Sequence, residues 1–281
     1  MFAAYVMWGC FPLYFYLFTG VSAWEVLAHR VVWSVVFVSI LISLMGRWGA
    51  VALVLGSIRR LWMFLLSGFF ISINWGVFIW ASTNGHIIDA GMGYFLNPLV
   101  AVALGALWLK ERMSRRQLAA LLLVGAGVAV LVVKQGQVPW IALALALAFG
   151  HYGLVRKQAP ADPLTGLLAE TLMVTPLALG FIVYQYASGQ GAFLVGNPKM
   201  DALLAFSGVV SSVPLILFAF GAKRIRLATV GLLQYVNPTM HVLLAVFLFG
   251  EAFNAAYGLA FAGIWTGLAL YSWDTLRQLR R

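Results

Sequence analysis

Two Asn-Pro pairs fall inside apolar runs of this chain, and they lie half a chain length apart. Asn97-Pro98 and Asn237-Pro238 each fall near the middle of a long apolar run. A proline inside a helix leaves a backbone carbonyl without its usual donor and permits a kink. Each asparagine adds a side-chain amide at the same depth, where lipid offers no hydrogen-bond partner. One such pair is also explained by a structural kink, but its repetition favours a polar binding cavity near the bilayer midplane.

Further polar and aromatic side chains near these breaks are candidates for the same cavity. An isolated Trp or Tyr more often packs or lies at the membrane interface, whereas a buried Asn needs a polar partner. The breaks themselves are assigned to Pro98 and Pro238. The predicted cavity residues are Asn74, Trp75, Trp80, Tyr94, Asn97, Gln234, Tyr235 and Asn237.

Ionisable side chains inside the apolar runs form a second group of candidates. Glu25 and His29 are four residues apart and share a helix face, whereas Arg30 points elsewhere. The alignment that superposes Gly9 on Gly150 also superposes His29 on Glu170, so ionisable groups fall at mirrored depths in the two halves. The alternative is that Glu25 is interfacial and Arg30 extends outward to the membrane surface. The candidates for gating or ion coupling are Glu25, His29, Arg30, His151, Tyr152 and Glu170.

Composition places the chain in a lipid bilayer. Hydrophobic residues make up 63% and charged residues only 9%, too little polar surface to cover a water-soluble globule. The net charge of +10 comes from short clusters between apolar runs, which does not favour nucleic-acid binding. The sequence has no Walker loop, HExxH or GxSxG motif and no Cys/His cluster. We therefore expect no enzymatic activity, no metal and no cofactor.

Ten apolar runs are long enough to cross a membrane, since a spanning helix needs about 20 residues. Gly, Pro and charged clusters mark their boundaries. The predicted fold is therefore all-α, an integral membrane protein with ten transmembrane helices. The runs are 2–19, 24–45, 61–82, 88–109, 116–134, 138–155, 164–184, 201–221, 227–249 and 256–274.

The constant offset between the two Asn-Pro pairs and their neighbours predicts an internal duplication into halves 1–135 and 136–281. Alternate connections hold 15 of the 18 Lys and Arg residues, so the positive-inside rule puts both termini in the cytoplasm. Five helices per half is an odd number, and the second half must therefore be inverted. Glu111 and Glu251 follow the two breaks and are interpreted as helix caps or solvated residues. Gly125-x-Gly127 and Gly263-x-x-x-Gly267 predict close helix packing.

Longer strings in the chain resemble a known family. They include Trp8-Gly9-x-x-Pro12-x-Tyr14-Phe15, Asn74-Trp75-x-x-Phe78-Ile79-Trp80-Ala81 and Gly93-Tyr94-Phe95-x-Asn97-Pro98-Leu99. They resemble the RarD branch of the EamA-type drug/metabolite transporters. The resemblance implies two inverted five-helix EamA repeats, a central substrate cavity, solute export and a bacterial inner-membrane location. Tyr16 departs from the family pattern, which has a lysine there.

The sequence thus predicts a secondary transporter that exports a small organic metabolite or drug by alternating access, without ATP. A facilitated uniporter or channel for a small metabolite, and a non-transporting membrane scaffold, remain as alternatives. The expected partners are a small-molecule substrate and the lipid bilayer. Proton coupling, the substrate's identity, the transport direction and the choice between monomer and homodimer stay open.

Overall fold

A computed structural model of the chain describes residues 2–108, 110, 114–159, 161–222 and 233–278. All regular elements among these residues are α-helices, which confirms the predicted all-α fold. Among the described helices, six are long and apolar enough to span a membrane. The helices are α1 (Phe2–Gly9), α2 (Phe11–Tyr16), α3 (Ala23–Leu44), α4 (Trp48–Leu55), α5 (Ile58–Thr83), α6 (Ile87–Trp108), α7 (Arg115–Gln135), α8 (Trp140–Gln158), α9 (Pro163–Ala187), α10 (Pro198–Ala222), α12 (Val236–Phe247) and α13 (Ala255–Gln278).

Three elements differ from the predicted runs. The first run is divided into α1 and α2 at Cys10, because Pro12 lies in the first turn of α2 and favours a new helix start there. Helix α4 was not predicted, since its eight residues are too short to cross a bilayer. The run predicted at 227–249 is described only from residue 233, and α12 begins at Val236. Glu111 also lies outside the described residues.

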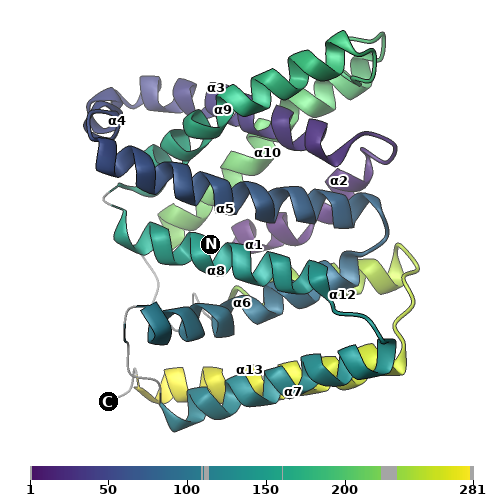
Figure 1. The fold of residues 1–281 in the computed structure, drawn as a ribbon. Coiled ribbons are helices and arrows are strands. Elements are labelled where there is room, and N and C mark those ends of the chain that lie inside the picture. The colour runs from purple at the N-terminus through teal and green to yellow at the C-terminus, as the bar shows by residue number, and fades with distance from the viewer. Residues whose placement is uncertain (1, 109, 111–113, 160, 223–232, 279–281) are drawn as a thin grey trace.

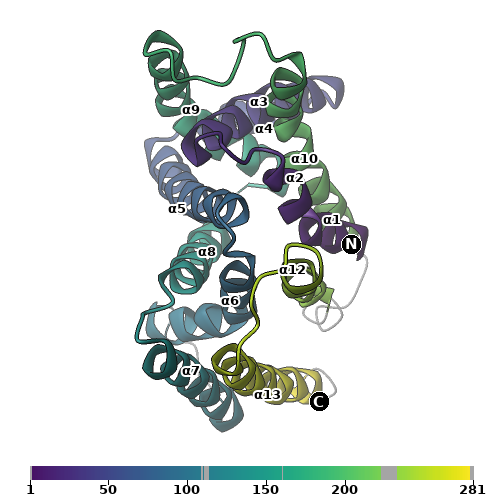
Figure 2. The ribbon, with the colours of Figure 1, turned by 90° about the vertical axis from the view of Figure 1, so that its right-hand side faces the viewer.

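The connections between helices gather on two opposite faces of the molecule (Figure 1). We call face A the one where α3 and α6 begin and α9 ends; it lies on the right in Figure 1. Face B, on the left, is where α3 ends and α9 begins. Helices α7 and α13 lie side by side at one end of the molecule in both views (Figures 1 and 2).

Glycines at helix crossings recur in the two halves and make reciprocal contacts. A Cβ added at Gly127 would lie 2.9 Å from the Ala260 carbonyl oxygen, and one added at Gly267 would lie 2.8 Å from that of Ala120. The offset between the Asn-Pro pairs also relates Gly127 to Gly267 and Ala120 to Ala260. The α7–α13 contact is therefore the same on both sides, as a two-fold relation between equivalent helices requires. Both glycines allow the helix backbones to approach closely.

A second pair of glycines, Gly9 and Gly150, also lies at equivalent helix crossings. A Cβ at Gly9 would meet the side chain of Met240 at 2.5 Å, and one at Gly150 would meet that of Val100 at 2.6 Å. Gly9 aligns with Gly150 in the same register as His29 with Glu170, and Val100 aligns with Met240 in the register of the Asn-Pro pairs. The α1–α12 crossing thus matches the α8–α6 crossing.

We expect Gly127→Ala to destabilise the protein by about 1–3 kcal/mol, because the added methyl group would press on the α13 backbone. Gly125→Ala is the matched control, since a Cβ there meets nothing within 4 Å. Alanine favours a helix over glycine by up to about 1 kcal/mol, so the control should be neutral or slightly more stable. The midpoint of thermal unfolding in detergent measures both. Equal midpoints for the two variants would contradict the packing role of Gly127.

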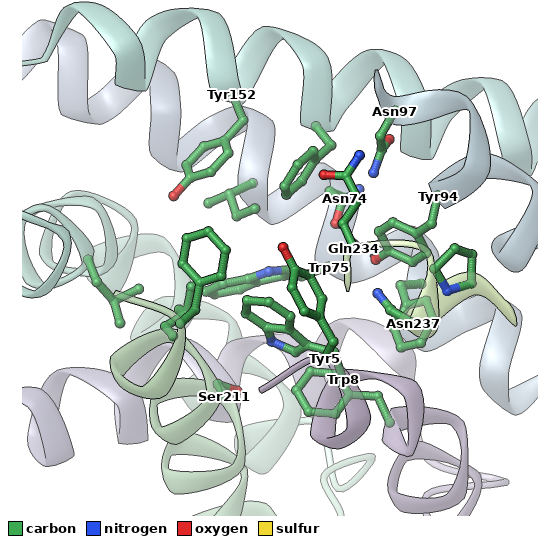
Figure 3. Close-up of a pocket in the computed structure, with 18 of the residues that line it drawn as sticks. Tyr5, Trp8, Asn74, Trp75, Tyr94, Asn97, Tyr152, Ser211, Gln234 and Asn237 are labelled. Carbon is green, nitrogen blue, oxygen red and sulfur yellow. Dashed lines mark hydrogen bonds between the residues drawn. The ribbon is translucent and has the colours of Figure 1, made fainter. Parts of the chain in front are cut away.

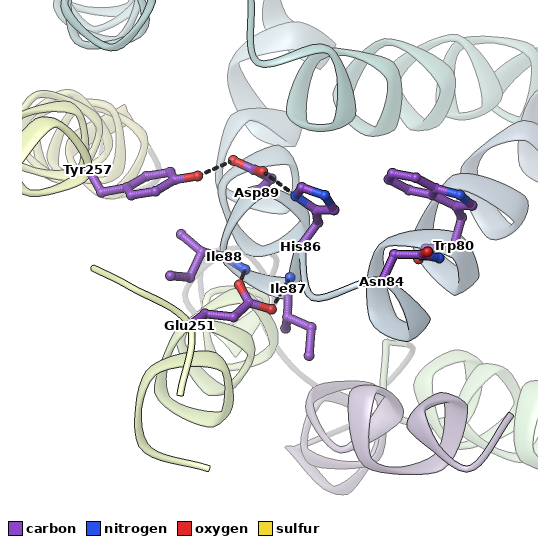
Figure 4. Close-up of polar contacts among 8 residues, drawn as sticks. All are labelled: Trp80, Asn84, His86, Ile87, Ile88, Asp89, Glu251 and Tyr257. Carbon is purple, nitrogen blue, oxygen red and sulfur yellow. Dashed lines mark hydrogen bonds and ion pairs between the residues drawn. The ribbon is translucent and has the colours of Figure 1, made fainter. Parts of the chain in front are cut away.

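Glu251 links the α12–α13 connection to the start of α6 on face A (Figure 4). Its two carboxylate oxygens accept hydrogen bonds from the backbone N–H groups of Ile87, at 2.6 Å, and Ile88, at 2.8 Å. These N–H groups have no partner within their own helix, so the carboxylate acts as a cap supplied from the other half. Nearby, Asp89 accepts a hydrogen bond from the Tyr257 hydroxyl at 2.9 Å. The capping interpretation of Glu251 agrees with this geometry.

Stability should depend on pH through Glu251. Burial raises the pKa of this carboxyl above its ordinary 4.5, although the two backbone hydrogen bonds oppose the shift. An acid with a raised pKa in the folded protein favours folding most when protonated, and this contribution is lost as pH rises through the raised pKa. The unfolding midpoint of the wild type, relative to Glu251→Gln, should therefore fall as pH increases from 4 upward. If the midpoint of the wild type relative to Glu251→Gln rises over this pH range, the pKa of Glu251 is lowered in the folded protein and the prediction is wrong.

Candidate substrate cavity

A cavity of about 410 Å³ lies between the helices, a volume within the range of small-molecule sites. Its described lining comes from α1, α2, α3, α5, α6, α8, α9, α10 and α12, and Figure 3 shows part of it. Helices α4, α7 and α13 contribute none of the described lining residues. Many of the lining side chains are aromatic, among them Tyr5, Trp8, Phe11, Trp75, Phe78, Tyr94, Phe149, Tyr152 and Phe218.

The two asparagines of the Asn-Pro pairs both line this cavity (Figure 3). Asn97 comes from α6 and Asn237 from α12, and these two helices pack against each other. The side-chain oxygens of both residues are buried and have no hydrogen-bond partner among the described residues. Pro98 lies inside a continuous α6, whereas Pro238 lies in the first turn of α12, where its missing N–H costs little. Two lining residues from equivalent positions therefore carry unpaired amide oxygens.

Asn74 and Tyr94 form a hydrogen-bonded pair in the cavity wall. The Asn74 amide donates to the Leu145 carbonyl at 3.0 Å and accepts from the Tyr94 hydroxyl at 3.2 Å. The pair ties α5 to both α6 and α8. Trp75 and Gln234 also face the cavity, so six of the eight predicted cavity residues line it. Those six are Asn74, Trp75, Tyr94, Asn97, Gln234 and Asn237.

The other two predicted cavity residues lie elsewhere. Trp80 stacks on His86 near face A, with ring centroids 5.3 Å apart, because α5 continues past the cavity. Tyr235 stacks on Phe95, with centroids 6.3 Å apart, and so faces away from the lining. Tyr16, the departure from the family pattern, is half exposed and contacts Phe249. Position 16 is therefore not among the lining residues, and the exchange of lysine for tyrosine there does not remove a charge from the cavity wall.

Arg30 enters the cavity wall instead of extending to the membrane surface. Its side chain is buried, and its guanidinium carbon lies 4.0 Å from the centre of the Trp75 ring. The rings of Phe11 and Phe15 lie 5.6 and 5.4 Å away. Arg30 Nε and Nη1 have no hydrogen-bond partner among the described residues. The arrangement leaves a cation in an aromatic environment without an anion.

A second, partly buried cation, Arg156, is paired. Its Nε donates to Glu170 Oε1 at 3.2 Å, and the same oxygen accepts from the Ser67 hydroxyl at 2.9 Å. The Tyr152 hydroxyl lies 3.4 Å from Glu170 Oε2. The run predicted at 138–155 ends just before Arg156, but α8 continues to Gln158 and carries Arg156 into the cavity wall. Glu170 lies behind the lining, with 1% of its surface exposed.

The remaining gating candidates lie toward face A or against α5. Glu25 accepts a hydrogen bond from the Ala192 N–H at 2.6 Å, and the His29 ring lies 4.6 Å from the Phe193 ring. Both contacts hold the α9–α10 connection over the start of α3. His151 stacks on Phe70 and lies 2.8 Å from the Leu147 carbonyl oxygen, outside the cavity lining.

On face B, Arg47 forms an ion pair of 2.9 Å with Asp162. Asp162 also caps α9 by accepting hydrogen bonds from the backbone N–H groups of Leu164 and Thr165. Burial alone would raise the pKa of Asp162, but its hydrogen bonds and Arg47 together hold it below the ordinary value. Each face therefore has one polar contact between the α3 region and the α9 region. On face A, Glu25 of α3 contacts Ala192 after α9, and on face B, Arg47 after α3 contacts Asp162 before α9.

Sequence analysis missed several lining residues, above all Tyr5, Trp8, Ser211 and His241. His241 Nε2 lies 3.1 Å from the Trp8 carbonyl oxygen, and its ring stacks on that of Phe78. Its position three residues after Pro238 was a usable signal, because it places the ring about one helical turn from the break. Trp8 lay within a string used for the family resemblance but had no assigned role.

The apolar spans and the largely aromatic cavity between the described helices define a multi-pass membrane protein with a space large enough for a small molecule. The profile of the EamA-like transporter family matches residues 1–133. A protein described as an uncharacterized transporter from Vibrio cholerae is 40% identical over 98% of this chain and 91% of its own length. The proteins called RarD from Escherichia coli (strain K12) and Streptomyces exfoliatus are each 40% identical over 280 residues.

These two alignments cover 99% and 100% of this chain, and 94% and 89% of the respective relatives. A crystal structure that shares 20% identity superposes with a TM-score of 0.62 over 99% of this chain and 96% of the other, which supports the fold. The chain belongs to the EamA-like transporter family and, within it, to the RarD branch, which confirms the resemblance found in its sequence.

Proposed function

We propose that this protein is a secondary carrier that exports a small organic metabolite or drug across the bacterial cytoplasmic membrane. The observation that carries the proposal is the cavity with two unpaired amide acceptors, Asn97 and Asn237, on equivalent helices. Buried polar groups without partners cost free energy, so their presence favours a role in binding a solute. The names of the relatives, which describe transporters, point the same way.

The proposed mechanism is alternating access between two inverted halves, 1–135 and 136–281. The reciprocal glycine contacts of α7 with α13, and of α1–α12 with α8–α6, support this relation. The contacts of Glu25 with Ala192 on face A and of Arg47 with Asp162 on face B would open in turn. We assign face B to the cytoplasm because most of the basic connections lie there.

Solute counterflow in proteoliposomes tests the proposal. Purified protein is reconstituted, loaded with one unlabelled compound from a panel of metabolites and antibiotics, and supplied with the same compound labelled outside. A carrier gives transient accumulation that saturates with concentration and requires the internal solute, whereas a channel gives neither. Repetition with an imposed pH gradient separates proton coupling from uniport. Absence of counterflow across the panel, by protein that remains folded, would favour the scaffold alternative.

A further inference from the structure

The unpaired guanidinium of Arg30 indicates what kind of solute the cavity takes. Arg30 has only 3% of its surface exposed and lines the cavity from α3, about 10 Å along the helix from face A. Its Nε and Nη1 have no hydrogen-bond partner among the described residues. Stacking on Trp75 offers far less than the hydration that a buried cation loses.

The charges around the cavity leave this cation uncompensated. The described lining includes two cations, Arg30 and Arg156, and no carboxylate. Glu170, the carboxylate behind the wall, already pairs with Arg156, and its other contacts are Ser67 and Tyr152. Glu25 contacts Ala192 at face A. An anion that enters the cavity would therefore meet a net positive site.

We infer that the solute is a small organic anion, whose carboxylate or similar group pairs with the edge of the Arg30 guanidinium beside Trp75. The guanidinium carbon lies 4.0 Å from the centre of the Trp75 ring, and the unpaired Nε–H and Nη1–H groups are left for a planar anion. The aromatic lining, which includes Tyr5, Trp8 and Phe78, suits an apolar or aromatic body on the same molecule. This inference rests on the proposed function and names its substrate class.

Matched aromatic acids and amides test the inference. The probes are indole-3-acetate and 3-phenylpropionate, each against its own primary amide, with the thermal unfolding midpoint of purified protein in detergent as readout. We expect both acids to raise the midpoint of the wild type in a saturable way and the amides to do so at least about tenfold more weakly, as expected when a charge-assisted hydrogen bond is lost. Amides that stabilise as well as the acids, or acids without effect, would overturn the inference.

Two variants locate the effect. Arg30→Met keeps an apolar stem without the charge and should bind the acids at least about tenfold more weakly. Arg59→Met removes an exposed arginine at the start of α5 and should bind as the wild type does. If Arg30→Met does not fold, the acid and amide comparison on the wild type still decides. Full acid binding by a folded Arg30→Met variant would also overturn the inference.

Counterflow measurements separate this inference from the proposed function. The vesicles contain phosphatidylcholine alone, so that no anionic lipid can occupy the site. Exchange of neutral or cationic solutes, with none of the acids, would leave the carrier standing and reject the anion. Acid binding that depends on Arg30, with no counterflow of any solute, would keep the anion site and reject the carrier. Exchange of the acids that is lost in Arg30→Met supports both.

Discussion

Replacement of Glu170 by glutamine should destabilise the protein by about 3–5 kcal/mol, the usual cost of leaving one member of a buried ion pair alone. Glutamine keeps the shape of the side chain but removes the charge that faces Arg156. Only 16% of Arg156 and 1% of Glu170 are exposed, so water can replace only part of the lost interaction. The free energy of unfolding in mixed micelles, from a denaturant titration, measures the effect.

Two further variants test the cause. Adding Arg156→Met to Glu170→Gln removes the orphaned cation and should recover much of the loss, which a general packing defect would not allow. Arg47→Met breaks the more exposed pair with Asp162 on face B, where 37% and 27% of the side chains are exposed. This variant should cost no more than about 1 kcal/mol. Similar losses for the two single variants would show that burial does not set the strength of these pairs.

Replacement of Asn97 or Asn237 by leucine should reduce counterflow by at least about tenfold, the cost of one lost polar contact to a bound solute. The same variants should unfold at the wild-type temperature or above it, because each removes a buried oxygen without a partner. This combination is expected only where unsatisfied groups are retained for function. Initial counterflow rates and thermal midpoints on the same preparations provide the two measurements.

Asn84→Leu provides the control, because Asn84 is exposed at the end of α5 and bonds only to residues beside it. It should leave counterflow unchanged. A loss of stability together with transport in the Asn97 and Asn237 variants would indicate a structural kink, the alternative that the sequence left open. Normal counterflow in both variants would remove the cavity amides from the mechanism.

The features that the sequence predicted are those with a repeat or a strong apolar pattern. The helices were predicted from long apolar runs. The equivalence of the two Asn-Pro pairs was predicted from their constant offset, which can be read without a tertiary structure. The same offset relates Gly127 to Gly267, which make reciprocal contacts in the structure. Periodicity thus locates elements and equivalent positions before any contact is known.

The side-chain environments could not be predicted in this way. Arg156 resembled one more basic residue in a cytoplasmic connection, and only the length of α8 shows that it lies in the cavity wall. Arg30 could equally have extended outward, and its inward position depends on rings from α2 and α5. Trp80 shares a helix with Trp75 but lies past the cavity. Such outcomes depend on which helices meet, and that information is not local in sequence.

The pairing of α7 with α13 has a consequence for ancestry. Each of these helices makes its main contacts with the other, across the boundary between the halves, and no described cavity residue comes from either. A polypeptide that consisted of one half alone would leave that seam, with its close-packed glycines, facing lipid. If the halves are inverted copies, as proposed above, a one-half ancestor would have needed a second copy inserted the opposite way up, and gene fusion would have made that antiparallel dimer permanent.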